Sequence, residues 1–130
     1  MIEAGMVALL RADATVAGLV GARIYPLKVP EPTVYPCLSY QVVSASPEST
    51  LDSRERGSKR IQFDAWGTSY GDCKRVLLAA KKVLHLFHGL LPDGTRALLI
   101  YNLQEIDDFE SDGRVYRSLA EYRAEYAEAS

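Results

Sequence analysis

Basic side chains cluster in one short stretch of the sequence, at Arg54, Arg56, Lys59 and Arg60. Cations at this density are suited to contact nucleic acid or an acidic protein surface. Acids are interleaved with them between positions 48 and 55, so the stretch is closer to charge balance than a phosphate-binding patch. A solvated loop, or a loop that faces a protein partner, is therefore favoured over a small nucleic-acid-binding module.

Carboxylates cluster further along the chain, at Asp107, Asp108, Glu110 and Asp112. Such a density of acids is typical of Ca²⁺ sites. The stretch nevertheless lacks the alternating ligand spacing and the distal glutamate of an EF-hand loop. A solvated acidic turn is the favoured interpretation.

Residue types that carry catalysis are sparse. His85 and His88 are the only histidines, and no acid or cysteine beside them completes a set of metal ligands. Cys37 and Cys73 lack the electropositive setting of a reactive thiol and are expected to be reduced and buried. The sequence contains no P-loop, no G-x-G-x-x-G and no G-x-S-x-G motif. We therefore predict no enzyme activity, no cofactor and no metal.

Tyrosine is abundant, with eight residues in the chain. A tyrosine ring is apolar while its hydroxyl stays hydrated, which suits a surface that another protein covers. The ordinary preference of strands for aromatic residues explains the same pattern, and both interpretations remain open. The candidate interface residues are Arg54, Arg56, Lys59, Arg60, Tyr116, Tyr122 and Tyr126.

The bulk properties describe one soluble domain over residues 1–130. A net charge of −2 gives no general attraction to DNA or RNA. No run of about 18 apolar residues is present, so no membrane span is expected. The N-terminus has no basic region before its apolar residues, so we expect no signal peptide and a cytoplasmic site of synthesis.

Apolar residues at helical spacing predict helices over residues 2–20 and about 70–87. Asp13 is expected to cap a second short helical turn and Gly21 to follow it, while Ser69 is expected to cap the later helix and Gly89 to end it.

The stretch 114–127, "RVYRSLAEYRAEYA", fits either an amphipathic helix or an alternating strand. The hairpin signal Asp112-Gly113 directly before it favours the strand. The prolines of residues 23–36 predict an extended surface connection, and residues 46–58 a long loop. The predicted strands are 37–45, 59–67, 97–106 and about 114–125. The fold class is α+β, an antiparallel four-stranded sheet with an amphipathic helix on one face and an N-terminal helix, in the order α-β-β-α-β-β.

Four stretches, in order, carry a resemblance to one family: "LVGARIYPLKVPEP", "YPCLSYQVVSASPESTLD", "RIQFDAWGTSYGDCKRVLLAAKKVL" and "DDFESDGRVYRSLAEYRAEY". Together they resemble the small tail-completion, or tail-terminator, proteins of long-tailed bacteriophages, prophages and gene-transfer particles. The resemblance covers residues 2 to 126, and the order and spacing of the stretches carry it.

The resemblance implies a non-enzymatic virion protein, made in the host cytoplasm and located at the neck end of the tail. It implies a homo-hexameric ring that caps the tail-tube protein, ends tube polymerisation and meets the head connector. Another neck component, a head-closure or connector-adaptor protein, is the alternative. In a ring, subunits are expected to meet through sheet edges and tyrosine-bearing surfaces. DNA would pass through the lumen without specific binding, and Asp107, Asp108, Glu110 and Asp112 are the candidate acidic belt facing it.

Overall fold

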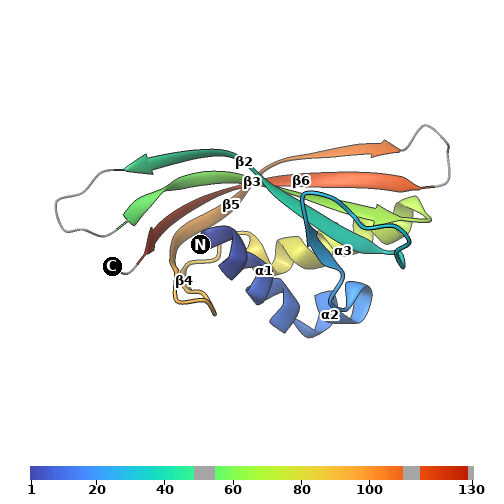
Figure 1. Cartoon of the computed structure of the whole chain (residues 1–130), viewed down its shortest axis with the longest axis horizontal. Coiled ribbons are helices and arrows are strands. Elements are labelled where there is room, and N and C mark those ends of the chain that lie inside the picture. The colour runs from blue at the N-terminus through green and yellow to red at the C-terminus, as the bar shows by residue number, and fades with distance from the viewer. Residues whose placement is uncertain (49–54, 110–114, 129–130) are drawn as a thin grey trace.

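A computed structural model describes residues 1–48, 55–109 and 115–128 of the chain. Three helices lie on one side of a six-stranded sheet and leave the other side uncovered (Figure 1). The helices are α1 (Ile2–Ala12), α2 (Ala14–Val20) and α3 (Tyr70–Leu84). The strands are β1 (Ile24–Pro26), β2 (Cys37–Glu48), β3 (Glu55–Gly67), β4 (Gly89–Leu90), β5 (Arg96–Phe109) and β6 (Tyr116–Glu128).

The C-terminal stretch is a strand, as its alternation and the hairpin signal predicted. β6 lies at the centre of the sheet, in the strand order β1-β2-β3-β6-β5-β4. It pairs antiparallel with β3 on one side and with β5 on the other. The predicted pairing of the last two long strands is confirmed, while the turn between them lies outside the described residues.

The predicted four-stranded antiparallel sheet is wrong, because the sheet has six strands and is mixed. β1 lies inside the proline-rich segment that was expected to be a plain connection, and it pairs in parallel with β2. Proline is tolerated there because an edge strand needs hydrogen bonds on one side only. β4 contains two residues, which is too short to give any periodicity. The amphipathic helix predicted on the sheet shares that face with the N-terminal helical segment, which forms α1 and α2, so three helices lie on it.

The segment 46–58 is less of a loop than predicted. Pairing between β2 and β3 continues to Glu48 opposite Arg56, so only residues 49–54, outside the described residues, remain of that loop. The backbone ladder continues here although the side chains show no apolar alternation. β6 lies along the other side of β3 and supports it as far as Glu55.

The helix termini follow the predicted caps at three of four positions. The Asp13 carboxylate accepts from the Val16 N–H at 3.0 Å, and the Ser69 hydroxyl from the Asp72 N–H at 3.1 Å. Gly21 follows α2 with a φ of 57°. α3 ends at Leu84 rather than at Gly89, because the next residues pair with β5 instead.

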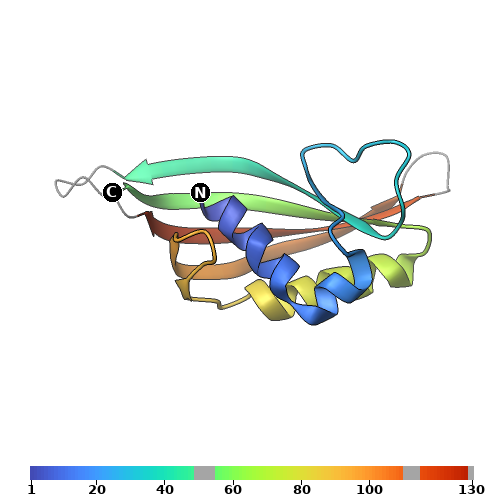
Figure 2. The same cartoon turned by 60° about the horizontal axis from the view of Figure 1, so that its bottom comes forward.

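The hydrophobic core lies between the three helices and the covered face of the sheet (Figure 2). β3 contributes Ile61, Phe63 and Ala65 to this face, and β6 contributes Ala120 and Tyr122. Because side chains alternate along a strand, the intervening residues of both strands lie on the uncovered face.

Candidate interaction surfaces

The uncovered face of the sheet carries two close ion pairs between β3 and β6. Arg60 Nη2 lies 2.6 Å from Glu121 Oε1, and Arg117 Nη2 lies 2.7 Å from Asp64 Oδ2. Asp64 and Glu121 are only 7% and 3% exposed, so their charges are largely removed from water. We call these four residues the arginine–carboxylate lattice.

Neighbouring amide side chains donate one further hydrogen bond to each carboxylate of the lattice. Gln62 Nε2 donates to Asp64 Oδ1, and Gln104 Nε2 to Glu121 Oε2, each at 2.7 Å. The Arg117 guanidinium also lies over the Trp66 ring, 5.3 Å from its centroid. Both guanidinium groups of the lattice are therefore already paired with a carboxylate on this face.

The predicted basic cluster does not form one patch. Lys59 lies on the helix side, where its Nζ is 2.9 Å from Glu3 Oε2 of α1, while Arg60 lies on the uncovered face. Arg56 lines a shallow hollow of about 260 Å³ together with Arg123. Arg54 lies outside the described residues. Consecutive strand residues point to opposite faces, which separates cations that are adjacent in sequence.

The predicted interface tyrosines divide into two groups. Tyr122 and Tyr126 are 0% and 3% exposed, and their rings belong to the core of the subunit. An interface role for these two does not fit this geometry. Tyr116 is 37% exposed and keeps an accessible ring.

The predicted acidic cluster is divided as well. Asp107 accepts hydrogen bonds from the Tyr70 hydroxyl at 2.8 Å, Lys74 Nζ at 3.1 Å and the Ser118 hydroxyl at 3.0 Å. These bonds, that of Tyr70 foremost, lower the pKa of the Asp107 carboxyl. Asp108 points to the opposite face, where Oδ2 lies 3.9 Å from Arg117 Nη1. Glu110 and Asp112 lie outside the described residues.

Both borders of the sheet are half covered and half open. On one border, β1 pairs with Leu38–Tyr40 of β2, and no strand of the described chain lies outside residues 41–48. We call residues 41–48 the β2 edge. It contains the bulge residue Val43, which is 46% exposed. The sequence signal for this bulge is the pair Val42-Val43, which interrupts the polar–apolar alternation of the strand.

The opposite border has the same construction. β4 pairs with Arg96 and Ala97 of β5, and residues 86–87 bond to Ile100. Beyond these contacts the Asn102 N–H donates to His85 Nδ1 at 3.0 Å. No strand within the described ranges covers the outer side of residues 103–107, which we call the β5 edge.

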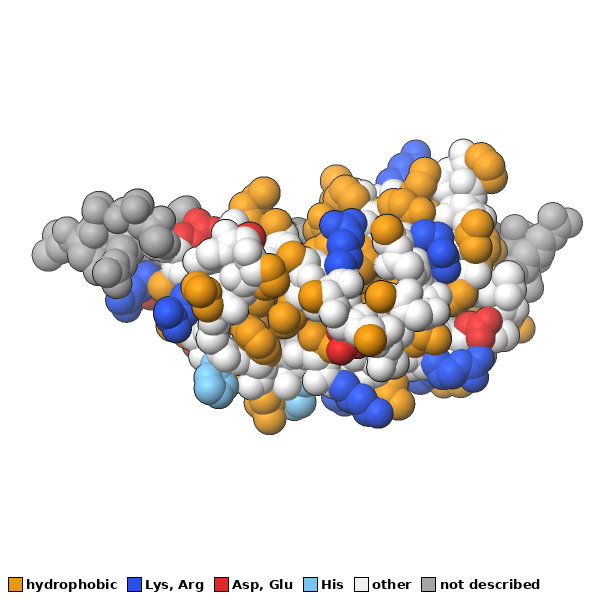
Figure 3. All heavy atoms as spheres, turned by 90° about the horizontal axis from the view of Figure 1, so that it is seen from below, with side chains coloured by type: hydrophobic (Ala, Val, Ile, Leu, Met, Phe, Trp, Pro, Cys, Tyr) orange, Lys and Arg blue, Asp and Glu red, His pale blue; other side chains and the backbone are white. Residues whose placement is uncertain are grey.

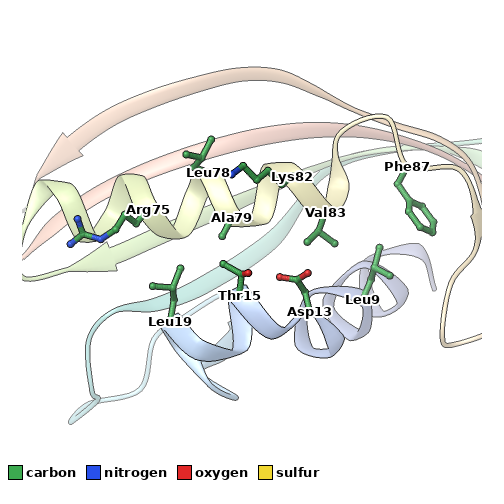
Figure 4. A pocket seen from close by; sticks show the side chains of 10 residues that line it. All are labelled: Leu9, Asp13, Thr15, Leu19, Arg75, Leu78, Ala79, Lys82, Val83 and Phe87. Carbon is green, nitrogen blue, oxygen red and sulfur yellow. The ribbon is translucent and has the colours of Figure 1, made fainter.

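The helix side contains an apolar groove of about 530 Å³ (Figure 4). Leu9 and Leu19 line one wall, Ala79 and Val83 of α3 line the other, and Phe87 lies at one end. Seen from this side, hydrophobic side chains are widespread, with lysine and arginine among them and acids sparse (Figure 3). No sequence pattern predicts this groove, because it forms between helices that are far apart in the chain.

Nothing in the described part of the chain indicates a reaction centre. None of its histidine, cysteine and acidic side chains form a group of three or more that could hold a metal ion. Cys37 and Cys73 are fully buried, and burial raises the pKa of each thiol to about 11. The described helices include none long and apolar enough to cross a membrane.

Comparison with known proteins supplies the identity. No curated protein matches the chain. Among solved structures, a chain described as "Virion of native gene transfer agent (GTA) particle" matches with a TM-score of 0.80 at 19% identity, over 97% of this chain and 94% of that chain. At this identity the match shows a shared fold. The sequence also matches the family described as "Tail completion protein gp17" over residues 4–127. The chain therefore belongs to this tail-completion family, as the four quoted stretches indicated, and is a structural protein of phage-type tails.

Proposed function

We propose that the protein forms a homo-hexameric ring that caps the tail tube, ends tube polymerisation and joins the tail to the head connector. The observation that carries this proposal is the match to the tail-completion family over almost the whole chain. The fold shared with a chain of a gene-transfer-agent virion supports it.

The construction of the sheet also supports a ring. A ring needs a heterologous contact, in which one surface of each subunit meets a different surface of the next. The β2 edge and the β5 edge are two such different surfaces on opposite borders of one sheet. The arginine–carboxylate lattice supports passage of DNA without binding at Arg60 and Arg117, because these two arginines are already paired with buried carboxylates. Of the proposed acidic belt, Asp108 lies on this same uncovered face and stays in the proposal, whereas Asp107 is bound to α3.

Two measurements test the proposal. Negative-stain images of the purified protein, alone and with tail tubes, are expected to show six-fold rings and rings at one end of each tube. Adding the protein to polymerising tail-tube protein is expected to stop tube growth. A protein that binds connector rings but neither caps tubes nor stops their growth would instead be a head-closure or adaptor component.

A further inference from the structure

The two open edges of the sheet have the properties of a joint between subunits. A strand at a sheet border presents a row of unpaired N–H and C=O groups, which pair readily with another strand. Proteins usually protect such borders with charges, prolines or covering segments. Residues 41–46 of the β2 edge contain no charged residue and no proline, and they include two exposed valines, Val42 and Val43. Residues 41–46 are therefore unprotected, and Pro47 and Glu48 stand only at the far end of the edge.

The β5 edge carries acids, but they are turned away from an incoming strand. Lys81 Nζ of α3 lies 3.3 Å from Glu105 Oε2, and Lys74 Nζ lies 3.1 Å from Asp107 Oδ1. Both carboxylates are thereby neutralised on the helix side. Ile106, between them, points to the uncovered face and is 47% exposed. The β5 edge thus offers backbone groups and an apolar side chain without an unbalanced charge.

The strand directions allow these edges to pair between copies that lie side by side. β2, β3, β6 and β5 alternate in direction, so β2 and β5 of one subunit are antiparallel. A second copy displaced within the plane of the sheet therefore brings its β5 antiparallel to the first copy's β2. Its helices then lie on the same side as those of the first copy.

The short border strands fix the stagger of this contact. β1 covers one half of its border, and β4, labelled in Figure 1, covers the diagonally opposite half of the other border. The β2 edge of one copy can meet the β5 edge of the next only if the second copy is shifted along the strand direction. After this shift, β1 of one copy and β4 of the next lie at opposite ends of the joint. A stagger between strands is also what the closure of a sheet into a barrel requires.

We propose that, in the ring, the β2 edge of each subunit pairs antiparallel with the β5 edge of the next, in the register that sets Ser46 opposite Ile106. This inference rests on the proposed ring and names the contact that builds it. Both residues lie on the uncovered face, as directly opposed residues must. In this register Glu48 meets Gln104, and no two acids are opposed, which avoids repulsion across the joint.

The test uses the full chain with the two substitutions Ser46→Cys and Ile106→Cys. Within one subunit these positions are separated by three strand spacings and six residues of β6, about 24 Å, so no intramolecular disulfide can form. The native thiols are buried and do not interfere. Under mild oxidation the double variant is expected to give a ladder of disulfide-linked species that ends at the hexamer. The single variants and the matched pair Ser46→Cys with Leu78→Cys, which lies on α3, are expected to give none.

Any other result of this cross-linking experiment overturns either the proposed joint or the proposed ring. Dimers from Ser46→Cys alone would show that two β2 edges pair with each other, which contradicts the proposed joint. Rings in the electron microscope without a ladder from the double variant would leave the ring intact and eliminate this joint. Absence of both rings and ladder, on tails as well as in solution, would overturn the proposed function together with the joint.

Discussion

At the scale of single residues, the alternation along β6 correctly predicted which side chains share a face of the strand, but it did not predict what covers each face. Tyr122 and Tyr126 fall on one side of the strand, as predicted, and that side proved to be covered by the protein's own helices. Alternation shows which side chains share a face. Whether a helix or another protein covers that face depends on segments far away in the sequence, here α1 and α3.

Tyr122 gives a prediction about stability. Its ring packs edge-on against Phe63, with centroids 6.0 Å apart, and its buried hydroxyl has no hydrogen-bond partner among residues 1–48, 55–109 and 115–128. Because an unpaired buried hydroxyl is destabilising, Tyr122→Phe is expected to raise the free energy of unfolding by about 1 kcal/mol. The midpoint of urea unfolding measures this. Tyr116→Phe, at an exposed ring, is the control and is expected to change nothing. A lower midpoint for Tyr122→Phe would show that the hydroxyl is satisfied.

The two cysteines give a prediction about reactivity. Burial raises the pKa of Cys37 and Cys73 to about 11, above the value of 9.0 of a free thiol. Both thiols therefore stay protonated at neutral pH. Their contribution to stability is complete below pH 9 and is lost as the pH rises towards 11. In a thiol-titration assay at pH 7 the native protein is expected to react at neither cysteine, and the urea-unfolded protein at both. Rapid labelling of the native protein would contradict the burial.

At the scale of elements, long periodic segments were predictable and short or unperiodic ones were not. The apolar face of α3 and the alternation in β3 and β6 follow from their own residues. β1 and β4 exist only because a longer strand lies beside them, so their two or three residues carry no signal of their own. The paired ends of β2 and β3, residues 44–48 and 56–60, are held together by backbone hydrogen bonds, and no side-chain pattern in the sequence predicts this pairing.

The anchorage of α3 to β5 is expected to be sensitive to acid. The hydrogen bonds from Tyr70 and Lys74 lower the pKa of Asp107, so its contribution to stability is present at neutral pH and is lost as the pH falls through that lowered pKa. Asp107→Asn is expected to lower the melting temperature at pH 7 and to reduce its decline between pH 5 and 2. Asp72→Asn, at an exposed ion pair, is the control. An unchanged acid profile for Asp107→Asn would show that this anchorage is unimportant.

The arginine–carboxylate lattice gives a prediction about DNA. Replacing both acids, in Asp64→Asn with Glu121→Gln, leaves Arg60 and Arg117 unpaired on the uncovered face. The double variant is expected to bind duplex DNA with an affinity that falls steeply with salt, whereas the native protein binds weakly or not at all. Fluorescence anisotropy measures this. The control, Asp72→Asn with Glu105→Gln, makes the same change of net charge on the helix side. Equal DNA binding by the two double variants would mean that net charge alone is responsible.

At the scale of the whole molecule, the position of the open half on each border of the sheet determines how two copies of the protein can pair. The sequence resemblance predicted a ring, but the half-covered borders became visible only with the strand order. The joint itself is a narrow row of backbone bonds, so a single contact is expected to be weak and the closed ring stable, because closure adds a contact without adding a subunit.

Ile106→Lys is therefore expected to abolish ring formation while leaving the melting temperature of the monomer within about 1 °C. The side chain is exposed in the subunit, so the added charge acts only where the next copy would cover it. Size-exclusion chromatography with light scattering measures the change. Leu78→Lys, at an exposed position on α3, is the matched control and is expected to keep the ring. Intact rings from Ile106→Lys would place the subunit contact elsewhere.

The place of β6 in the sheet has a consequence for how the protein is made. Of the described strands, the one that joins the β2–β3 hairpin to β5 leaves the ribosome after all the others. Until β6 is made, the β2 edge belongs to the β2–β3 hairpin and the β5 edge to a separate strand, and no sheet fixes the distance between them. A chain still in synthesis, or one cut short before Tyr116, has no complete sheet to offer to a neighbour. If the proposed pairing of edges holds, chains that lack β6 are expected to be excluded from the ring.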